Sequence, residues 1–198
     1  AERIVVYDLM ESDPQRALEW SIAHDLAQQG EFIEDSFNRL LEKNPESAQA
    51  TLETLEISSE TRRALAGSVA NHFAEENDSA AALEILVKEN ITGEILGKSL
   101  MGYLHEHPTA ASEWVKTLPA GEFRDLSVFT LASFLRYQDQ PDFEGSFLWA
   151  QTMQVSDKRD DALLETLRDW EERQPGASRQ ALESSRLPPA ERGRLLGI

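Results

Sequence analysis

Acidic residues at helical spacing are the first candidates for chemistry in this sequence. Within the stretch 159–172, Asp161 and Glu165 stand four positions apart and so share a helix face, and Asp160 adjoins them. Paired carboxylates can hold magnesium or transfer protons. Arg168 lies one turn further along that face, however, so an exposed ladder of ion pairs accounts for these acids without a site. We therefore favour a structural role for them over catalysis or metal binding.

Two histidines, His105 and His107, are the second candidates. They are two positions apart near the expected end of a helix, so their rings point to different faces, which favours contact with the helix C-terminus over a metal chelate. The chain has no cysteine, and it lacks the nucleophile-elbow, phosphate-loop, dinucleotide and zinc-protease motifs. We expect no catalytic, cofactor-binding or metal-binding residue and a protein that is not an enzyme. A small α-helical enzyme, the alternative, needs a buried cluster of titrating groups.

Arginine recurs shortly after a predicted turn and an acidic residue, as in the stretch LPAGEFR (118–124). The four arginines at such places are Arg62, Arg124, Arg159 and Arg192. A cation in the first turn of a helix opposes the helix dipole, so each arginine needs an offsetting contact. In an antiparallel hairpin, the free carbonyls at the end of the preceding helix can accept hydrogen bonds from a guanidinium. We interpret the four arginines as structural clamps of helical hairpins, and a ligand-binding row is the alternative.

A periodic set of proline and aspartate residues divides the chain into similar segments. The marks are Pro14, Pro45, Asp78, Pro108, Pro141 and Pro175. Their spacing of about 30–34 residues matches two short helices and two turns, which is the period of a helical solenoid. Ser59, Thr92 and Ser156 are placed to cap the second helix of their segments.

This period predicts an all-α fold, an α-solenoid of about five to six helical hairpins in a single helical-repeat domain. The domain spans residues 1–198, with units near 1–13 (partial), 14–44, 45–77, 78–107, 108–140, 141–174 and 175–198 (partial). Trp20, Trp114 and Trp149 fall early in their units, and we expect these side chains to fill grooves between hairpins. An exposed, partner-binding aromatic row is the alternative.

The run from Trp114 to Arg124 has the pattern W-x3-LP-x-G-x2-R. With the period and the proline boundaries, it resembles the divergent tetratricopeptide-like helical-hairpin repeats of large bacterial proteins. The paired Gly and Tyr of the standard tetratricopeptide first helix are missing. The resemblance covers nearly the whole chain, and it implies a right-handed stack of hairpins with a concave face that holds another polypeptide.

Charge narrows the classes of partner. The chain has 36 acidic against 19 basic side chains, a net charge of −17, which disfavours nucleic acid and anionic lipid surfaces. No apolar run approaches the roughly 18 residues of a membrane-spanning helix, so we expect no membrane insertion. We expect the partner to be another protein or peptide of basic or neutral character.

The two ends of the sequence bear on its setting. The chain opens with AERIVV, without methionine, and both ends fall within a unit. The missing methionine favours a periplasmic or otherwise exported protein over a cytoplasmic one. The ends within a unit favour a piece of a longer repeat array, and an unusual pair of end caps is the alternative. The leading hypothesis is a non-enzymatic protein–protein interaction scaffold. The alternative is a helical accessory or spacer domain of a larger envelope-associated protein or enzyme.

Overall fold

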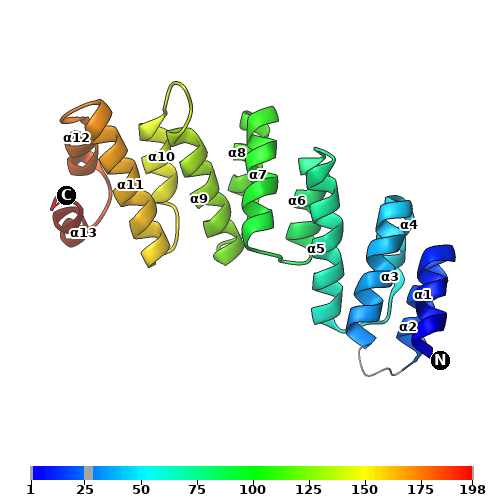
Figure 1. The fold of residues 1–198 in the computed structure, drawn as a ribbon. Coiled ribbons are helices and arrows are strands. Elements are labelled where there is room, and N and C mark those ends of the chain that lie inside the picture. Colours follow the sequence, from blue (N-terminus) through cyan, green and yellow to red (C-terminus); the bar gives the residue numbers. More distant parts are fainter. Residues whose placement is uncertain (1, 25–28, 198) are drawn as a thin grey trace. The chain divides into compact units, whose positions relative to one another are not determined.

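The computed structural model of the chain describes residues 2–24 and 29–197, and within these ranges it contains helices and no strand. The all-α prediction is confirmed (Figure 1). The chain divides into two compact units, residues 1–91 and 92–198. In each unit consecutive helices pack on one another, with the exception of the last two helices of the second unit, as they do in a helical solenoid.

The first unit holds six helices: α1 (Glu2–Ser12), α2 (Pro14–Ala23), α3 (Gln29–Lys43), α4 (Pro45–Thr54), α5 (Ser59–Glu75) and α6 (Ser79–Lys88). Helices α1, α3 and α5 contact one another in that order and form one row. The shorter helices form a second row, because α2 packs on α1 and α3, α4 packs on α3 and α5, and α6 packs on α5.

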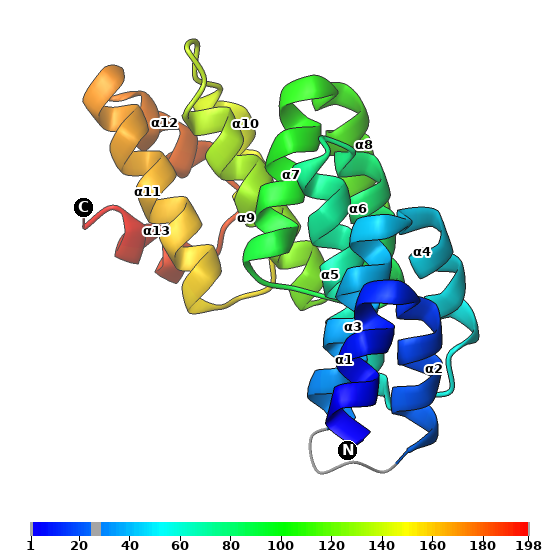
Figure 2. The ribbon, with the colours of Figure 1, turned by 45° about the vertical axis from the view of Figure 1, so that its right-hand side comes forward.

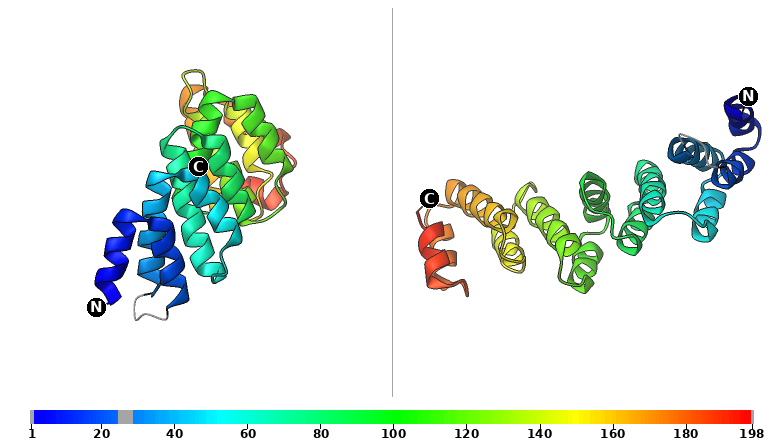
Figure 3. Two further views of the ribbon diagram at one scale, coloured as in Figure 1. Left: turned by 90° about the vertical axis from the view of Figure 1, so that its right-hand side faces the viewer. Right: turned by 90° about the horizontal axis from the view of Figure 1, so that it is seen from below.

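The second unit repeats this arrangement with α7 (Glu94–Glu106), α8 (Pro108–Thr117), α9 (Glu122–Arg136), α10 (Phe143–Ala150), α11 (Asp157–Arg173), α12 (Ala177–Ser184) and α13 (Pro189–Leu195). Helices α7, α9 and α11 form the row of longer helices, and α8, α10 and α12 pack against them. Figure 2 shows α9, α10 and α11 side by side, and the right-hand view of Figure 3 looks nearly along the helix axes.

The starts of the short helices follow from local chemistry. Asp13, Asn44 and Asp78 precede α2, α4 and α6, and each side chain accepts the backbone N–H three residues on, at 3.0–3.1 Å. Pro14 and Pro45 occupy the first helical position, where their missing N–H is not needed. Each such cap is worth about 1 kcal/mol, so these residues fix where the helices begin.

The longer helices begin with other caps. Ser156 caps α11 as the sequence predicts, because its hydroxyl accepts the N–H three residues on at 3.3 Å. The predictions of Ser59 and Thr92 as caps are wrong, because the first cap lies one residue before Ser59 and the second lies one residue after Thr92. Ser58 caps α5 with a hydroxyl that accepts at 3.0 Å, and Gly93 precedes α7 with a φ of 106°. That backbone conformation favours glycine over threonine, which accounts for the second difference.

Leucine and phenylalanine side chains fill the interior of both units. In the first unit the fully buried residues include Leu18, Phe37 and Leu65, and in the second they include Leu100 and Leu163. Burying each such side chain stabilises the fold by about 1.5–3 kcal/mol before conformational entropy is counted.

The three tryptophans expected to fill grooves, Trp20, Trp114 and Trp149, are half-buried. Trp20 packs against a cluster of α1, α2 and α3 side chains that includes Val6 and Phe32, and so fills a groove between hairpins. Trp114 meets Phe123 of its own hairpin edge to face, with ring centroids 6.3 Å apart. Trp149 is half-buried. Neither of these two is shown to join hairpins.

Candidate functional site

Arg62 and Arg192 contact the helix that precedes them in their own hairpin. The guanidinium of Arg62 donates to the Leu52 and Leu55 carbonyls at the end of α4, both at 2.5 Å. Arg192 Nη1 donates to the Glu183 carbonyl in the last turn of α12 at 2.7 Å. These carbonyls lack intrahelical donors, so each arginine satisfies groups that the helix end leaves free. These are the partners expected of a hairpin clamp.

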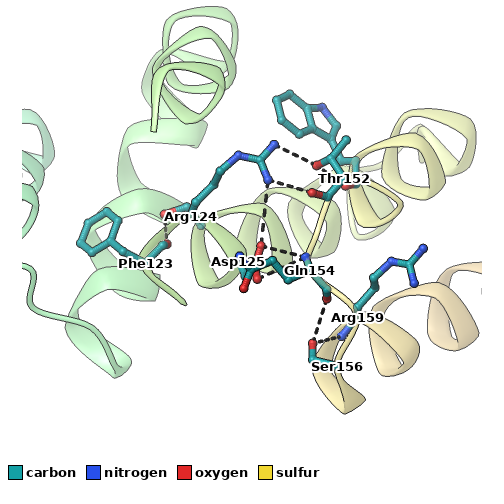
Figure 4. Close-up of polar contacts among 9 residues, drawn as sticks. Phe123, Arg124, Asp125, Thr152, Gln154, Ser156 and Arg159 are labelled. Atoms are coloured by element: carbon teal, nitrogen blue, oxygen red, sulfur yellow. Dashed lines mark hydrogen bonds and ion pairs between the residues drawn. The ribbon is translucent and has the colours of Figure 1, made fainter. Parts of the chain in front are cut away.

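Arg124 and Arg159 contact the next hairpin instead of their own. Arg124 donates to the carbonyl and the hydroxyl of Thr152 after α10, at 2.9 and 3.1 Å (Figure 4). Arg159, whose side chain is 6% exposed, donates to Glu191 Oε1 on α13 at 2.6 Å. The four arginines are therefore of two kinds, those that close a hairpin and those that join two hairpins.

The position of the arginine in its helix separates the two kinds. Arg62 and Arg192 are the fourth residues of α5 and α13, whereas Arg124 and Arg159 are the third residues of α9 and α11. One residue along a helix turns the side-chain direction by about 100°. The sequence motif alone treats the four as equivalent, because it counts from the turn and not from the first helical residue.

Asp125 strengthens the join between α9 and the segment that follows α10. Both of its carboxylate oxygens accept the backbone N–H of Gln154 at 3.3 Å, and it lies 4.0 Å from Arg124 (Figure 4). The carboxylate is nearly buried. It therefore anchors the α10–α11 connection to the start of α9.

Two of the three acids considered for catalysis or metal binding pair with arginines from other hairpins. Glu165 accepts from Arg136 Nη2 of α9 at 2.8 Å, and Asp160 pairs with Arg194 of α13 at 2.7 Å. Asp161, on the same helix, is exposed. The helical spacing predicts Arg168 of the same helix as the partner of these acids, whereas the arginines that pair with them come from other helices. In the described ranges no group of three His, Cys, Asp or Glu is placed to hold a metal ion.

Arg136 is the residue of this network that sequence reasoning missed. Its side chain is 3% exposed, its Nε lies 3.7 Å from Asp169, and its guanidinium lies 5.0 Å from the ring centroid of Tyr137. A signal for it exists, because Arg136 follows Val128 and Ala132 at intervals of four on the buried face of α9. A charged residue on an apolar stripe indicates a buried partner.

The two histidines have separate surroundings. The His105 ring meets Phe134 edge to face at 5.1 Å, and the His107 ring meets Tyr103 at 5.5 Å. His107 also precedes α8 without a side-chain hydrogen bond to its first turn. Each histidine ring therefore contacts an aromatic side chain, and the two rings do not form a pair.

Unit 1 contains a groove between α4 and α6, with α5 as its floor. We call it the α4–α6 groove; its volume is about 430 Å³. Its apolar lining comprises Leu52, Ala66, Val69, Ala81 and Ile85, and its polar lining comprises Gln49, Glu53, Arg62, Glu84, Lys88 and Glu89. The α5 residues at its base, Ala66 and Val69, are fully buried, and Leu52 and Ile85 on its sides are only 7% and 9% exposed.

Unit 2 has a smaller hollow, about 270 Å³, between α11, α12 and α13. The Ser178 hydroxyl and the Gly176 N–H both donate to the Glu171 carboxylate on its edge, and these bonds lower the pKa of Glu171. A carboxylate with a lowered pKa in the folded state stabilises the fold above its ordinary pKa and loses that effect as the pH falls through the lowered value. Because Glu171 is exposed, the effect is small.

Comparison with protein-family models, with curated proteins and with solved structures finds no match to this chain. Among the described residues, no helix combines the length and the apolar character that crossing a bilayer requires.

Proposed function

We propose that the chain is a non-enzymatic protein–protein interaction scaffold built from divergent tetratricopeptide-like hairpins. The observation that carries the proposal is the packing of each unit, in which short helices rest on a row of longer ones; in unit 1 a groove runs between α4 and α6. Stacked hairpins of this kind present extended surfaces suited to another polypeptide.

The charged side chains that could do chemistry support the same proposal by their partners. Arg124, Asp125, Arg136 and Arg159 are nearly buried or half-buried and hold hydrogen bonds or ion pairs within the chain. Groups engaged in this way position helices, and a substrate would have to displace them. We assign them to structure and assign function to the surface.

The net charge of −17 indicates the class of partner. A strongly acidic surface speeds the encounter with basic proteins at low ionic strength and repels other anionic molecules. The partner is therefore a basic or neutral protein or peptide.

Quantitative affinity capture from separate soluble and envelope extracts tests the proposal, with a charge-matched acidic helical protein as the control. We expect one protein in equimolar amount. Five exposed apolar residues are each replaced by serine in turn: Tyr7, Val87, Tyr137, Leu148 and Val155. At least one replacement should abolish recovery of the partner, because apolar contacts carry most of the affinity of an interface. The exposed-acid variant Asp161→Asn keeps the partner.

Retention of no protein beyond the control would contradict the scaffold. That result would favour the alternative, a helical spacer or accessory domain of a larger protein.

A further inference from the structure

Two asparagines are candidates for a covalent modification, which lies beyond the proposed binding function. Each begins the tripeptide pattern Asn-x-Ser/Thr, whose asparagine can accept an N-linked glycan when the middle residue is not proline. The two tripeptides are NDS (77–79) and NIT (90–92), one before and one after α6. The sequence pattern treats them as equivalent, so the choice between them depends on the structure.

The two asparagines themselves have similar surroundings. Asn77 and Asn90 are both exposed, and both lie in the left-handed backbone region, with φ of 62° and 50°. In each case the N–H of the following residue donates to the carbonyl five residues earlier, at 2.8 and 2.9 Å, which ends the preceding helix. Neither carboxamide makes a hydrogen bond within the described ranges. Nitrogen Nδ2 is therefore accessible in both.

The hydroxyl that completes the NDS tripeptide is held inside a helix. A transferase binds this hydroxyl as well as the asparagine, which is why the pattern ends in serine or threonine. Ser79 is the first residue of α6 and is 6% exposed. The residue between the two, Asp78, caps α6 by accepting the N–H of Ala81 at 3.0 Å. A transferase could bind this tripeptide only after the first turn of α6 had unwound.

The hydroxyl of the NIT tripeptide lies outside the helices. Residues 91–93 are not helical, and α7 begins only at Glu94. Thr92 is half-buried, and its hydroxyl makes no hydrogen bond with any group that the structure describes. This tripeptide can therefore bend into the site of a transferase while α6 and α7 stay folded.

We propose that Asn90 is an N-glycosylation site of the folded chain and that Asn77 is not. The donor is a sugar activated as a diphosphate ester, either of a nucleotide or of a lipid. Nδ2 of Asn90 forms a bond to the anomeric carbon of the sugar, and the bond between that carbon and the diphosphate oxygen breaks. The proton that leaves Nδ2 passes to a base of the transferase.

Peptide mass spectrometry of the tagged, full chain expressed in its source cell tests the proposal. We expect the peptide with Asn90 to carry the mass of a glycan and the peptide with Asn77 to be unmodified. Thr92→Ala should abolish the modification, and Thr92→Ser, which keeps the hydroxyl, should retain it. Ser79→Ala is the matched control and should change nothing. A single sugar on Asn90 indicates a nucleotide donor, and a preassembled oligosaccharide indicates a lipid donor.

Transfer in vitro tests whether the fold makes the choice. The purified chain is incubated with UDP-glucose and a soluble N-glycosyltransferase, beside unstructured synthetic peptides that span residues 71–83 and 84–96. Both peptides should accept glucose, because each presents its hydroxyl freely. In the folded chain only Asn90 should accept it.

Two results would overturn the proposal. If Asn90 of the chain from the source cell is unmodified, it is not a glycosylation site, whatever the reaction in vitro shows. If Asn77 and Asn90 are modified equally in the folded chain, the helical position of Ser79 does not protect the first tripeptide and the structural choice is wrong. Neither result bears on the scaffold proposal, which rests on the packing of the helices.

Discussion

The two units differ in the ion pairs that connect their hairpins. In unit 1 the cross-hairpin ion pairs lie on the surface, with the side chains of Arg39 and Lys88 50% and 62% exposed in their pairs with Glu11 and Glu53. In unit 2 the side chains of the Arg159–Glu191 pair are 6% and 13% exposed and the Arg136 side chain is 3% exposed, although Arg194, which pairs with Asp160, is 58% exposed. Exposed pairs contribute about 0–1 kcal/mol, whereas removing one member of a buried pair costs about 3–5 kcal/mol.

Two units of similar helical arrangement therefore share an apolar core and differ in the charged contacts added to it. Unit 1 depends on apolar fit around residues such as Phe37, and its surface charges are free to exchange partners. Unit 2 adds buried ties that fix which side of α9 meets α11. The exposed ion pairs of unit 1 can be replaced by ion pairs with a binding partner, whereas the buried pair of unit 2 fixes how its hairpins pack.

The largest expected effect concerns the apolar core of unit 1. Phe37→Ala should lower the free energy of unfolding by about 4 kcal/mol, because Phe37 is fully buried and its removal leaves a cavity. Phe37→Leu should cost only roughly 1 kcal/mol. Urea denaturation followed by circular dichroism measures both. Equal, small losses would mean that apolar fit does not hold unit 1.

The buried arginine of unit 2 should have the next largest effect. Arg136→Ala should lower the free energy of unfolding by about 2–3 kcal/mol, mainly because it removes the buried stem, since Glu165 and Asp169 are 47% and 34% exposed and stay hydrated without it. Arg136→Met retains the stem and should recover most of the loss. Arg39→Ala, the exposed counterpart in unit 1, should cost less than about 1 kcal/mol. A similar loss for Arg136→Ala and Arg39→Ala would remove the contrast between the units.

Arg62 and Arg63 form a matched pair for testing the clamp interpretation. Arg62→Ala should lower the free energy of unfolding by about 2 kcal/mol, because the Leu52 and Leu55 carbonyls lose their donors. The neighbouring Arg63 is exposed, so Arg63→Ala should cost less than about 0.5 kcal/mol. Arg62→Lys should recover little, since an ammonium cannot reproduce the two-pronged contact. Equal effects of the two alanine variants in thermal melts would argue against a clamp.

The smallest effect is expected for the exposed pair of unit 1. Glu53→Gln should change the free energy of unfolding by less than about 1 kcal/mol, and the difference should vanish at high salt because solvent ions screen the charges. Denaturation at two salt concentrations measures it. A loss that persists at high salt would show that this pair is structural.

Residues with local effects were predicted well from the sequence. Pro14, Pro45 and Pro108 begin helices as expected, because proline fixes φ and suits the first helical position. Pro141 lies two residues before the start of α10, since the carboxylate of Asp142 caps that helix. Local chemistry thus predicted the order of helices and placed most of their starts within two residues.

Contacts between hairpins could not be predicted in this way. The motif that contains Arg124 and Arg159 predicted carbonyl partners in the same hairpin, but both side chains reach the next one. The partner depends on whether the arginine is the third or the fourth residue of its helix, because a shift of one position turns the side chain by about 100°. The α4–α6 groove depends on residues from three helices that no local pattern joins.

The ties that run from one hairpin to the next in unit 2 also bear on its response to mechanical load. Arg124 bonds to Thr152, Arg136 to Glu165 and Arg159 to Glu191, so each tie spans about one hairpin of chain. Residues 124–152, 136–165 and 159–191 overlap along the chain, so the rupture of one tie under a pulling force does not release a whole hairpin. A load on unit 2 is therefore passed from each tie to the next.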